Sequence, residues 1–163
     1  MDQQTPTKDL ELLVFELAGV RYALELPSVR EVVHAVLISP LPEAPVVIEG
    51  IIDVRGEVVP VYDLRVRFGL PARALDPGER LVVAWTGSRR VAFRCERTEW
   101  VEGVSPSLED SPNVLGSAGR HIAGVVHLPD GLVMIQNLDE FLDAAETVAL
   151  DAALSHRQAA VAQ

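Results

Sequence analysis

The sequence contains a single cysteine, Cys95, and only 5% of its 163 residues are aromatic. One cysteine excludes an internal disulfide and a metal site built on a Cys-x-x-Cys pair. Cys95 is better explained as a small buried residue than as a nucleophile, because no histidine is placed beside it by the sequence. Few aromatic residues and many valines predict an aliphatic core built from strands, since β-branched side chains suit a pleated surface.

Basic residues are also scarce, with 14 Lys and Arg against 24 Asp and Glu, and the net charge is −10. This balance argues against nucleic acid and against an anionic membrane surface as partners. No apolar run reaches the roughly 18 residues of a membrane-spanning helix, so we expect no direct membrane insertion. The first residues lack the order of a signal peptide. We therefore expect a cytoplasmic protein.

The motifs of common catalytic sites are missing: the sequence has no HExxH, GxSxG, P-loop or GxGxxG. Its four histidines are scattered. Asp53, Asp63 and Asp139 are the candidates for an acid–base pair, but Asp63 is better explained as the cap of a short helix behind it. We predict no enzyme, no cofactor and no metal. A small β-barrel enzyme with a site made from dispersed Asp and His residues stays open as a weaker alternative.

Short apolar runs separated by turn signals predict a chain of hairpins. Residues 1–8 are expected to form a disordered leader, residues 9–154 one domain of two small subdomains, and residues 155–163 a frayed tail. Hairpins are predicted over 10–26, 51–61, 81–95 and 120–138, and a polar connection over 105–119. Helices are predicted over 27–36, with Val29, Val32 and Val33 on one face, over 63–68, and from near Leu138 toward Leu154 with Asn137 or Asp139 as the cap.

The two halves of the chain contain similar motifs. Ile48-x-Gly50-Ile51-Ile52 recurs as Ile122-x-Gly124-Val125-Val126, and Val61-x-Asp63-Leu64 recurs at the same displacement as Ile135-x-Asn137-Leu138. Tyr22-Ala23 and Val32 resemble Val91-Ala92 and Val101 at a slightly different displacement. The repetition predicts two copies of one small β unit, packed as a pair of barrels. A chance likeness between apolar hairpins is the alternative.

The segment GIIDVRGEVVPVYDLRVRF, from Gly50 to Phe68, places Arg55 and Gly56 at a tight reversal between two apolar runs. Glycine supplies the backbone conformation that such a turn requires. Nothing in the apolar runs requires a long cation at the tip. Arg55 is therefore either a solvated turn residue or a guanidinium that offers forked donors to the carboxylates or carbonyls of a partner.

This segment, with Leu13 to Leu26, Val29 to Val33, and IAGVVHLPDGLVMIQNLDEFL in the second half, resembles the CheW family of bacterial chemotaxis adaptors. The resemblance implies a mainly β fold: two pseudo-repeated five-stranded SH3-like barrels sharing an aliphatic core, with short helices and a C-terminal helix. Exchange of strands between the barrels is left open. It also implies a non-catalytic role, in which the protein couples the cytoplasmic tips of methyl-accepting chemoreceptors to the regulatory domain of a CheA-type histidine kinase in chemosensory arrays.

The resemblance implies five partner-binding residues: Arg55, Gly56, Glu31, Val29 and Leu81. A receptor helix would lie in a groove between the barrels, with apolar residues supplying contact area and charges setting the register. Each residue also has a plainer explanation. Glu31 fits an ordinary surface charge, and Val29 fits an ordinary core position.

The second half departs from the family pattern. After the strand pair of the second half, where the family commonly has a Val-Asp-Val-like stretch, this sequence reads FRCERTEWV, with Arg94, Cys95 and Arg97 inserted in the pattern. Asp53 stands where many members carry Asn. These changes leave open a divergent member that serves a non-flagellar chemosensory pathway.

Overall fold

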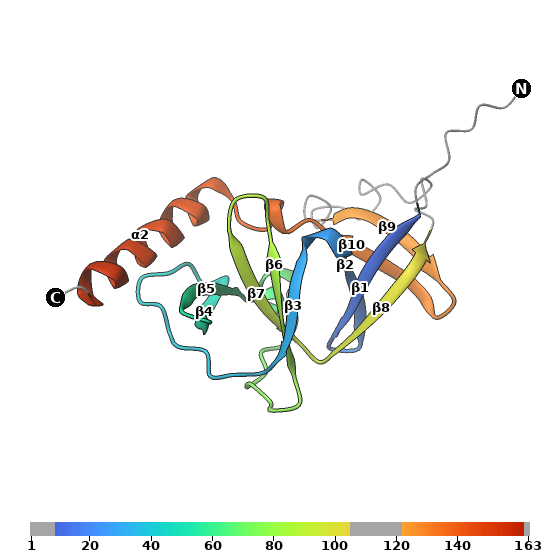
Figure 1. Cartoon of the computed structure of the whole chain (residues 1–163), viewed down its shortest axis with the longest axis horizontal. Helices are drawn as coiled ribbons and strands as arrows, with labels where there is room; N and C mark the ends of the chain where they lie inside the picture. The colour runs from blue at the N-terminus through green and yellow to red at the C-terminus, as the bar shows by residue number, and fades with distance from the viewer. Residues whose placement is uncertain (1–8, 105–121, 162–163) are drawn as a thin grey trace, which may run out of the picture.

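The computed structural model describes residues 9–104 and 122–161, which form a mainly β structure with a C-terminal helix (Figure 1). The elements are β1 (Leu10–Leu17), β2 (Val20–Glu25), η1 (Leu26–Ser28), β3 (Val29–His34), β4 (Ile48–Val54), β5 (Glu57–Tyr62), α1 (Leu64–Phe68), β6 (Arg80–Trp85), β7 (Arg90–Cys95), β8 (Arg97–Val104), β9 (Ile122–Leu128), β10 (Gly131–Gln136), η3 (Leu138–Glu140) and α2 (Ala144–Val161). The predicted leader and polar connection lie outside the described residues.

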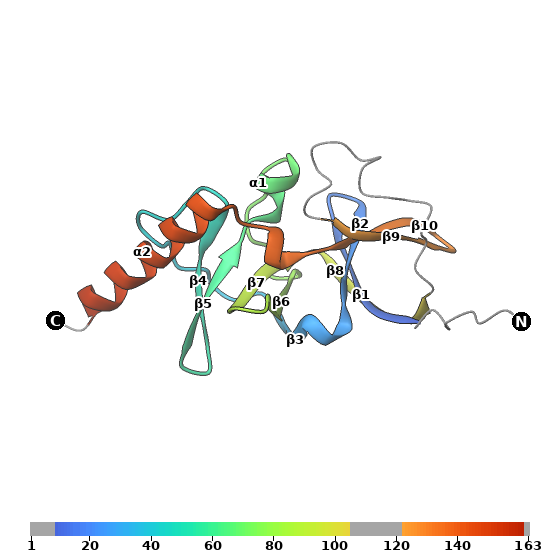
Figure 2. The ribbon, with the colours of Figure 1, turned by 90° about the horizontal axis from the view of Figure 1, so that it is seen from above.

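The strands form two five-stranded sheets that exchange strands between the halves of the chain. Sheet A has the order β8-β1-β2-β10-β9, and sheet B has the order β3-β6-β7-β5-β4. The first hairpin of each half therefore pairs with the last three strands of the other half, and the two sheets lie next to each other (Figure 2). This arrangement confirms the expected fold class and shows that strands are exchanged.

The repeat found in the sequence corresponds to equivalent positions in the two sheets. Ala23 pairs in parallel with Ile135 in sheet A, and Ala92 pairs in parallel with Val61 in sheet B. These are matching positions of the two repeats. The motifs thus mark the strands where one half of the chain joins the other, and they do not reflect a chance likeness between hairpins.

The repeated Ile-x-Gly motif marks a β-bulge in each sheet. The pairing of β4 with β5 shifts between Ile48 and Gly50, and the pairing of β9 with β10 shifts at the corresponding Ile122 and Gly124. A bulge bends and twists its strand, which favours tight curvature of a small sheet. Gly50 has a second constraint, because a Cβ atom there would lie 2.2 Å from the carbonyl oxygen of Ser39.

Strands β1 and β6 are buried on both faces. Along β1, Leu12 and Val14 point into an aliphatic cluster enclosed by sheet A, while Leu13, Phe15 and Leu17 point into a core shared by the two sheets. Strand β6 alternates in the same way between the interior of sheet B and the shared core. This burial explains the continuous apolar runs of both strands.

The shared core holds most of the few aromatic residues. The rings of Phe15 and Phe93 lie 4.7 Å apart between centroids, and the ring of Tyr22 stacks on those of Phe15 and Phe68. The sheet interiors are aliphatic, as predicted, but the layer between them is partly aromatic.

The prediction of a helix over residues 27–36 is wrong, because this segment forms η1 and then strand β3. Arg30 is an extra residue in β3, since the pairing with β6 shifts between Val29 and Glu31. The bulge lets Val29 and Val32 both face the shared core, although three positions separate them. A bulged strand therefore produced the spacing that was interpreted as helical. Strand β8 was not predicted at all.

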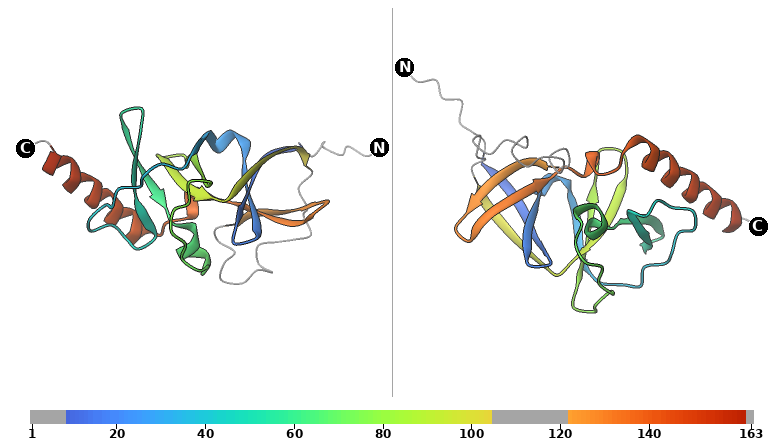
Figure 3. Two further views of the ribbon diagram at one scale, coloured as in Figure 1. Left: turned by 90° about the horizontal axis from the view of Figure 1, so that it is seen from below. Right: turned by 180° about the vertical axis from the view of Figure 1, so that it is seen from behind.

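Helix caps agree in part with the predictions. Asp63 caps α1 by accepting a hydrogen bond from the Val66 amide, as predicted. Asn137 caps only η3. Helix α2 begins later, where Asp143 and Glu146 form a reciprocal capping box, and it continues to Val161, past the predicted end of the domain. In Figure 3 it lies beside sheet B, at the far end from sheet A.

Within the described residues, no helix is both long and apolar enough to cross a membrane.

Glu96 joins the two sheets where the chain crosses from β7 to β8. Its carboxylate accepts hydrogen bonds from the amide of Ala18, 3.0 Å away in the β1–β2 turn, and from Arg65 of α1 at 2.6 Å, and it pairs with Arg73 at 2.9 Å. Burial alone would raise the pKa of the Glu96 carboxyl, but these donors favour the ionised form and hold the pKa below its usual value of 4.5. Glu96 therefore stabilises the fold when ionised.

We expect Gly50→Ala to destabilise the protein by about 2 kcal/mol, because the added methyl group must displace the Ser39 backbone. Ser39 and Ile51 exchange two backbone hydrogen bonds at this point, which limits the movement. Gly124→Ala is the matched control, since its Cβ would make only an ordinary contact, 3.9 Å from Ile135. Urea denaturation measures both variants. Equal losses of stability would contradict the steric explanation.

We expect Glu96→Gln to lower the free energy of unfolding by about 2 kcal/mol at neutral pH, because hydrogen bonds to a charged group are lost. A lowered pKa stabilises the folded state above the unfolded pKa, and this contribution disappears as pH falls below 4.5. The difference between variant and wild type should therefore shrink between about pH 5 and pH 3. Glu99→Gln, which loses an exposed partner of Arg21, is the control. A pH-independent difference would refute the assigned role.

Candidate functional site

The turn between β4 and β5 is a rigid two-residue reversal at the end of a projecting hairpin (Figure 2). Arg55 and Gly56 both have left-handed backbone conformations, with φ of 50° and 87°. Two successive positive φ values are typical of a type I′ turn, whose twist matches that of the flanking strands. The carboxylate of Asp53 accepts a hydrogen bond of 2.7 Å from the Gly56 amide. The turn is therefore held in one conformation, with Arg55 at its tip.

Arg55 lies next to Glu31, another of the residues that the sequence predicted to bind a partner. The guanidinium donates to the carboxylate of Glu31 on β3 over 2.6 Å. The side chain of Arg55 is 76% exposed, whereas that of Glu31 is 24% exposed. An exposed ion pair of this kind contributes little to stability, so the arginine keeps donors for other acceptors at a small energetic cost.

The other two predicted apolar contacts differ in their burial. Val29 is half-buried at the start of β3, where it packs against the shared core beside Ala84. Leu81 is fully buried in the interior of sheet B and pairs with Val33. Its side chain does not reach the surface, so the structure corrects the prediction that Leu81 faces a partner. Arg55, Gly56 and Glu31 lie together at the β4–β5 turn, whereas Val29 on β3 packs toward the shared core. These four residues remain the candidates for partner binding and are named here the β4–β5 surface.

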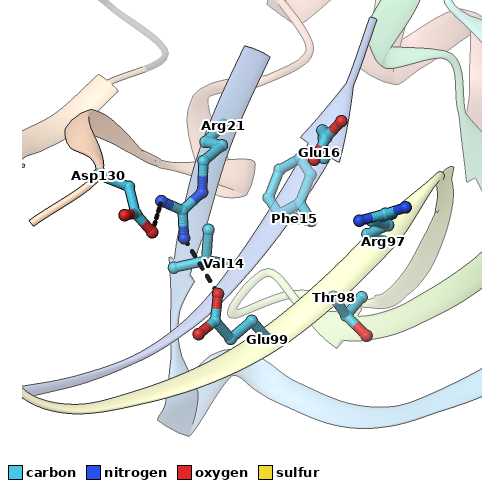
Figure 4. A pocket seen from close by; sticks show the side chains of 8 residues that line it. All are labelled: Val14, Phe15, Glu16, Arg21, Arg97, Thr98, Glu99 and Asp130. Carbon is cyan, nitrogen blue, oxygen red and sulfur yellow. Dashed lines mark hydrogen bonds and ion pairs between the residues drawn. The ribbon is translucent and has the colours of Figure 1, made fainter. Parts of the chain in front are cut away.

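Sheet A carries a related arrangement that the sequence reasoning missed. Arg21 on β2 pairs with Glu99 on β8 at 3.1 Å and with Asp130 in the β9–β10 turn at 3.3 Å, beside a hollow of about 440 Å³ (Figure 4). At the equivalent position of sheet B, Arg90 pairs with Glu57 at 3.0 Å. Strands β2 and β7 are the ones that pair in parallel with a strand from the other half of the chain. In each sheet, the arginine on this strand thus forms an ion pair with the hairpin contributed by the other half. The sequence Arg-x-Ala, which begins at Arg21 and recurs at Arg90, is the signal in the sequence that could have revealed this repeated ion pair.

The departure at Arg94 is explained by two carboxylates, the buried one of Glu79 and the partly buried one of Glu49. Arg94 pairs with Glu49 at 2.8 Å and with Glu79 at 3.0 Å, and it also donates to the backbone of Arg73. Burial raises the pKa of the Glu49 carboxyl, while Arg94 opposes that rise. The cluster fastens the segment between α1 and β6 to sheet B, so Arg94 has a structural role and leaves no free charge for a partner.

Cys95 is fully buried in the shared core, as predicted. Burial raises the pKa of its thiol to about 12. Because only the thiolate is an effective nucleophile or metal ligand, Cys95 offers neither function at neutral pH. The described residues also contain no group of three or more His, Cys, Asp and Glu side chains that fits a metal ion.

Comparisons with known proteins agree with this architecture. The chain is 25% identical to the chemotaxis protein CheW of Treponema pallidum over 145 residues, and this aligned region covers 85% of each chain. It is 26% identical to the chemotaxis protein CheW of Helicobacter pylori, over 86% of each chain. It is 34% identical to protein FrzA of Myxococcus xanthus, over 71% of this chain and 73% of FrzA.

Among solved structures, the chain is similar to the crystal structure of the scaffolding protein TtCheW from Thermoanaerobacter tengcongensis. The TM-score is 0.72 at 26% identity, and the match covers 85% of this chain and 96% of the other. The model of the CheW-like domain family matches residues 11–146. The chain therefore belongs to the CheW-like domain family.

Proposed function

We propose that this protein is a non-catalytic signalling adaptor that couples chemoreceptor cytoplasmic tips to the regulatory domain of a CheA-type histidine kinase. The observation that carries the proposal is Arg55, held at the tip of a rigid turn and largely exposed, in a chain of the CheW-like family. Relatives that cover most of this chain are named chemotaxis proteins, and one solved relative is described as a scaffolding protein.

The β4–β5 surface has the chemistry to bind an amphipathic receptor helix. Val29 offers a half-buried apolar contact, and Arg55 offers forked donors to carboxylates or to helix carbonyls. Glu31 holds the guanidinium in place before binding, which reduces the side-chain entropy lost on association. Apolar area and a preordered charge together favour a specific contact.

The exchanged strands support a scaffolding role. The two sheets share one core and are joined through Glu96, so surfaces at opposite ends of the molecule keep a fixed spacing. A receptor bound at one end and a kinase domain bound at the other would therefore be held in a defined relation. No bond-making by this chain is needed for such a task.

We expect Arg55→Ala to fold normally and to lose about 2 kcal/mol of receptor affinity, because an anchoring arginine near the centre of an interface is removed. The change in folding stability should stay below about 0.5 kcal/mol, since the residue lies at an exposed turn. A pull-down with the receptor's cytoplasmic fragment, together with urea denaturation, measures both quantities. Arg21→Ala removes a comparable ion-paired arginine at the other sheet and serves as the control.

Wild-type binding by Arg55→Ala would remove this residue from the interface. Failure of the wild-type chain itself to bind receptor fragments or a CheA-type kinase would overturn the adaptor proposal as a whole.

A second candidate is the same adaptor chemistry in a non-flagellar chemosensory pathway. The identity to FrzA, 34%, exceeds the 25% and 26% quoted for two proteins named for chemotaxis. Deletion of the gene distinguishes the two candidates. Loss of directed swimming supports the flagellar role, whereas unchanged swimming with an altered surface movement supports the second.

A further inference from the structure

A surface hollow lies where the chain crosses from β7 to β8, beside the segment that leads into β6 (Figure 1). Its volume is about 380 Å³. The lining comes from the beginning of β6 and the beginning of β8, and it consists of Gly78, Arg80, Glu96, Arg97 and Thr98. Two arginines that lie far apart in the sequence therefore meet at one place on the surface.

Arg97 has no partner for its charge among the residues that the structure describes. It is exposed at the start of β8, next to Thr98 (Figure 4). Glu16 lies directly opposite in the pairing of β1 with β8, yet the two side chains form no ion pair. Most other arginines of the described chain, such as Arg21 and Arg90, do pair with a carboxylate. The guanidinium of Arg97 therefore keeps its donors for a ligand.

Arg80 is also without a carboxylate in the described part of the chain, but it is held in place. Its Nη1 atom donates to the backbone carbonyl oxygens of Gly78 and Glu79, at 3.1 Å and 3.4 Å. These two acceptors hold the guanidinium through one nitrogen and leave its other nitrogens to face an incoming group. Because the side chain is ordered before binding, it loses little conformational entropy on association.

Glu96 is the carboxylate that lines the hollow, and its charge is balanced from another side. Arg65 pairs with it at 2.6 Å and Arg73 at 2.9 Å. Glu96 therefore does not need Arg80 or Arg97 as a partner. The hollow holds two cations in excess of its own lining carboxylate, which is unusual in a chain with a net charge of −10.

The donors of the hollow suit carboxylates better than phosphates. A guanidinium offers parallel donors that match the two oxygens of a carboxylate. A phosphate group carries nearly two negative charges at neutral pH, so Glu96 repels it more strongly than it repels a carboxylate. The net charge of −10 opposes any anion at long range, but physiological salt largely screens charges beyond about 8 Å. The local arginines therefore decide what binds.

From these observations we infer that this hollow, named here the crossover hollow, binds neighbouring acidic side chains of a partner protein. Arg80 and Arg97 each receive a carboxylate, and the Thr98 hydroxyl donates a further hydrogen bond. The site is separate from the β4–β5 surface, and it does not depend on the adaptor role proposed for that surface.

The test uses Nα-acetyl-triglutamate amide as the probe and the uncharged Nα-acetyl-triglutamine amide as the matched control. Chemical shifts of the ¹⁵N-labelled full chain report binding at each backbone amide and at the arginine Nε atoms. We expect saturable shifts at Gly78, Arg80, Arg97 and Thr98 with a Kd of about 1 mM, because only a few ion pairs form in water. Triglutamine should cause no saturable shift there, and inorganic phosphate should bind more weakly than triglutamate.

We expect Arg97→Gln to weaken triglutamate binding about tenfold. Its folding stability should match that of the wild type in urea denaturation, since the residue is exposed. Arg30→Gln is the control, because Arg30 likewise donates to a backbone carbonyl but lies on β3, and it should leave binding unchanged.

Equal binding of triglutamine, or unchanged binding by Arg97→Gln, would overturn the inference. Tighter binding of phosphate than of triglutamate would overturn the assignment to acidic side chains. The absence of saturable shifts in the folded wild-type chain would overturn it too, without affecting the result of the receptor pull-down.

Discussion

Burial of both faces of β1 and β6 is the constraint on which the rest of the structure depends. Each strand contributes alternate side chains to the interior of its own sheet and to the core between the sheets. A fully buried aliphatic or aromatic side chain stabilises the fold by about 1.5–3 kcal/mol, so two such strands supply much of the apolar burial of the molecule. Because the first hairpin of each half is completed by strands from the other half, either half alone would leave its hairpin uncovered. The shared core therefore also sets the relative orientation of the two sheets.

The repeat that builds the two sheets does not give them the same surface. Arg21 and Arg90 occupy equivalent positions and make equivalent ion pairs, which shows that the internal joints are repeated. The exposed tips differ: at the displacement that relates Ile48 to Ile122, Arg55 corresponds to Pro129 and Gly56 to Asp130. A cationic tip on one sheet and an acidic one on the other favour different partners. Internal symmetry with dissimilar ends suits a protein that joins two unlike components.

Local signals predicted the hairpins, the Arg55-Gly56 turn and the Asp63 cap, because each depends on residues close together in the sequence. Three features depended on distant residues and were missed or misassigned. The spacing of Val29 and Val32 had the period of a helix only because Arg30 is bulged. Arg94 looked anomalous because Glu49 and Glu79, which neutralise it, lie far away in the sequence. Leu81 was assigned to a partner-facing surface by the family resemblance, whereas strand alternation places it inside sheet B.

The β7–β8 crossover shows how one charged group can fix the relation between the two sheets. The Glu96 carboxylate there receives an amide hydrogen bond from the β1–β2 turn and two guanidinium groups, those of Arg65 and Arg73. Hydrogen bonds to an ionised group are stronger than those between neutral groups. A single carboxylate therefore ties the first turn of sheet A to α1, which follows β5 of sheet B, and this contact holds the two sheets in one relative position at the point where the chain passes between them.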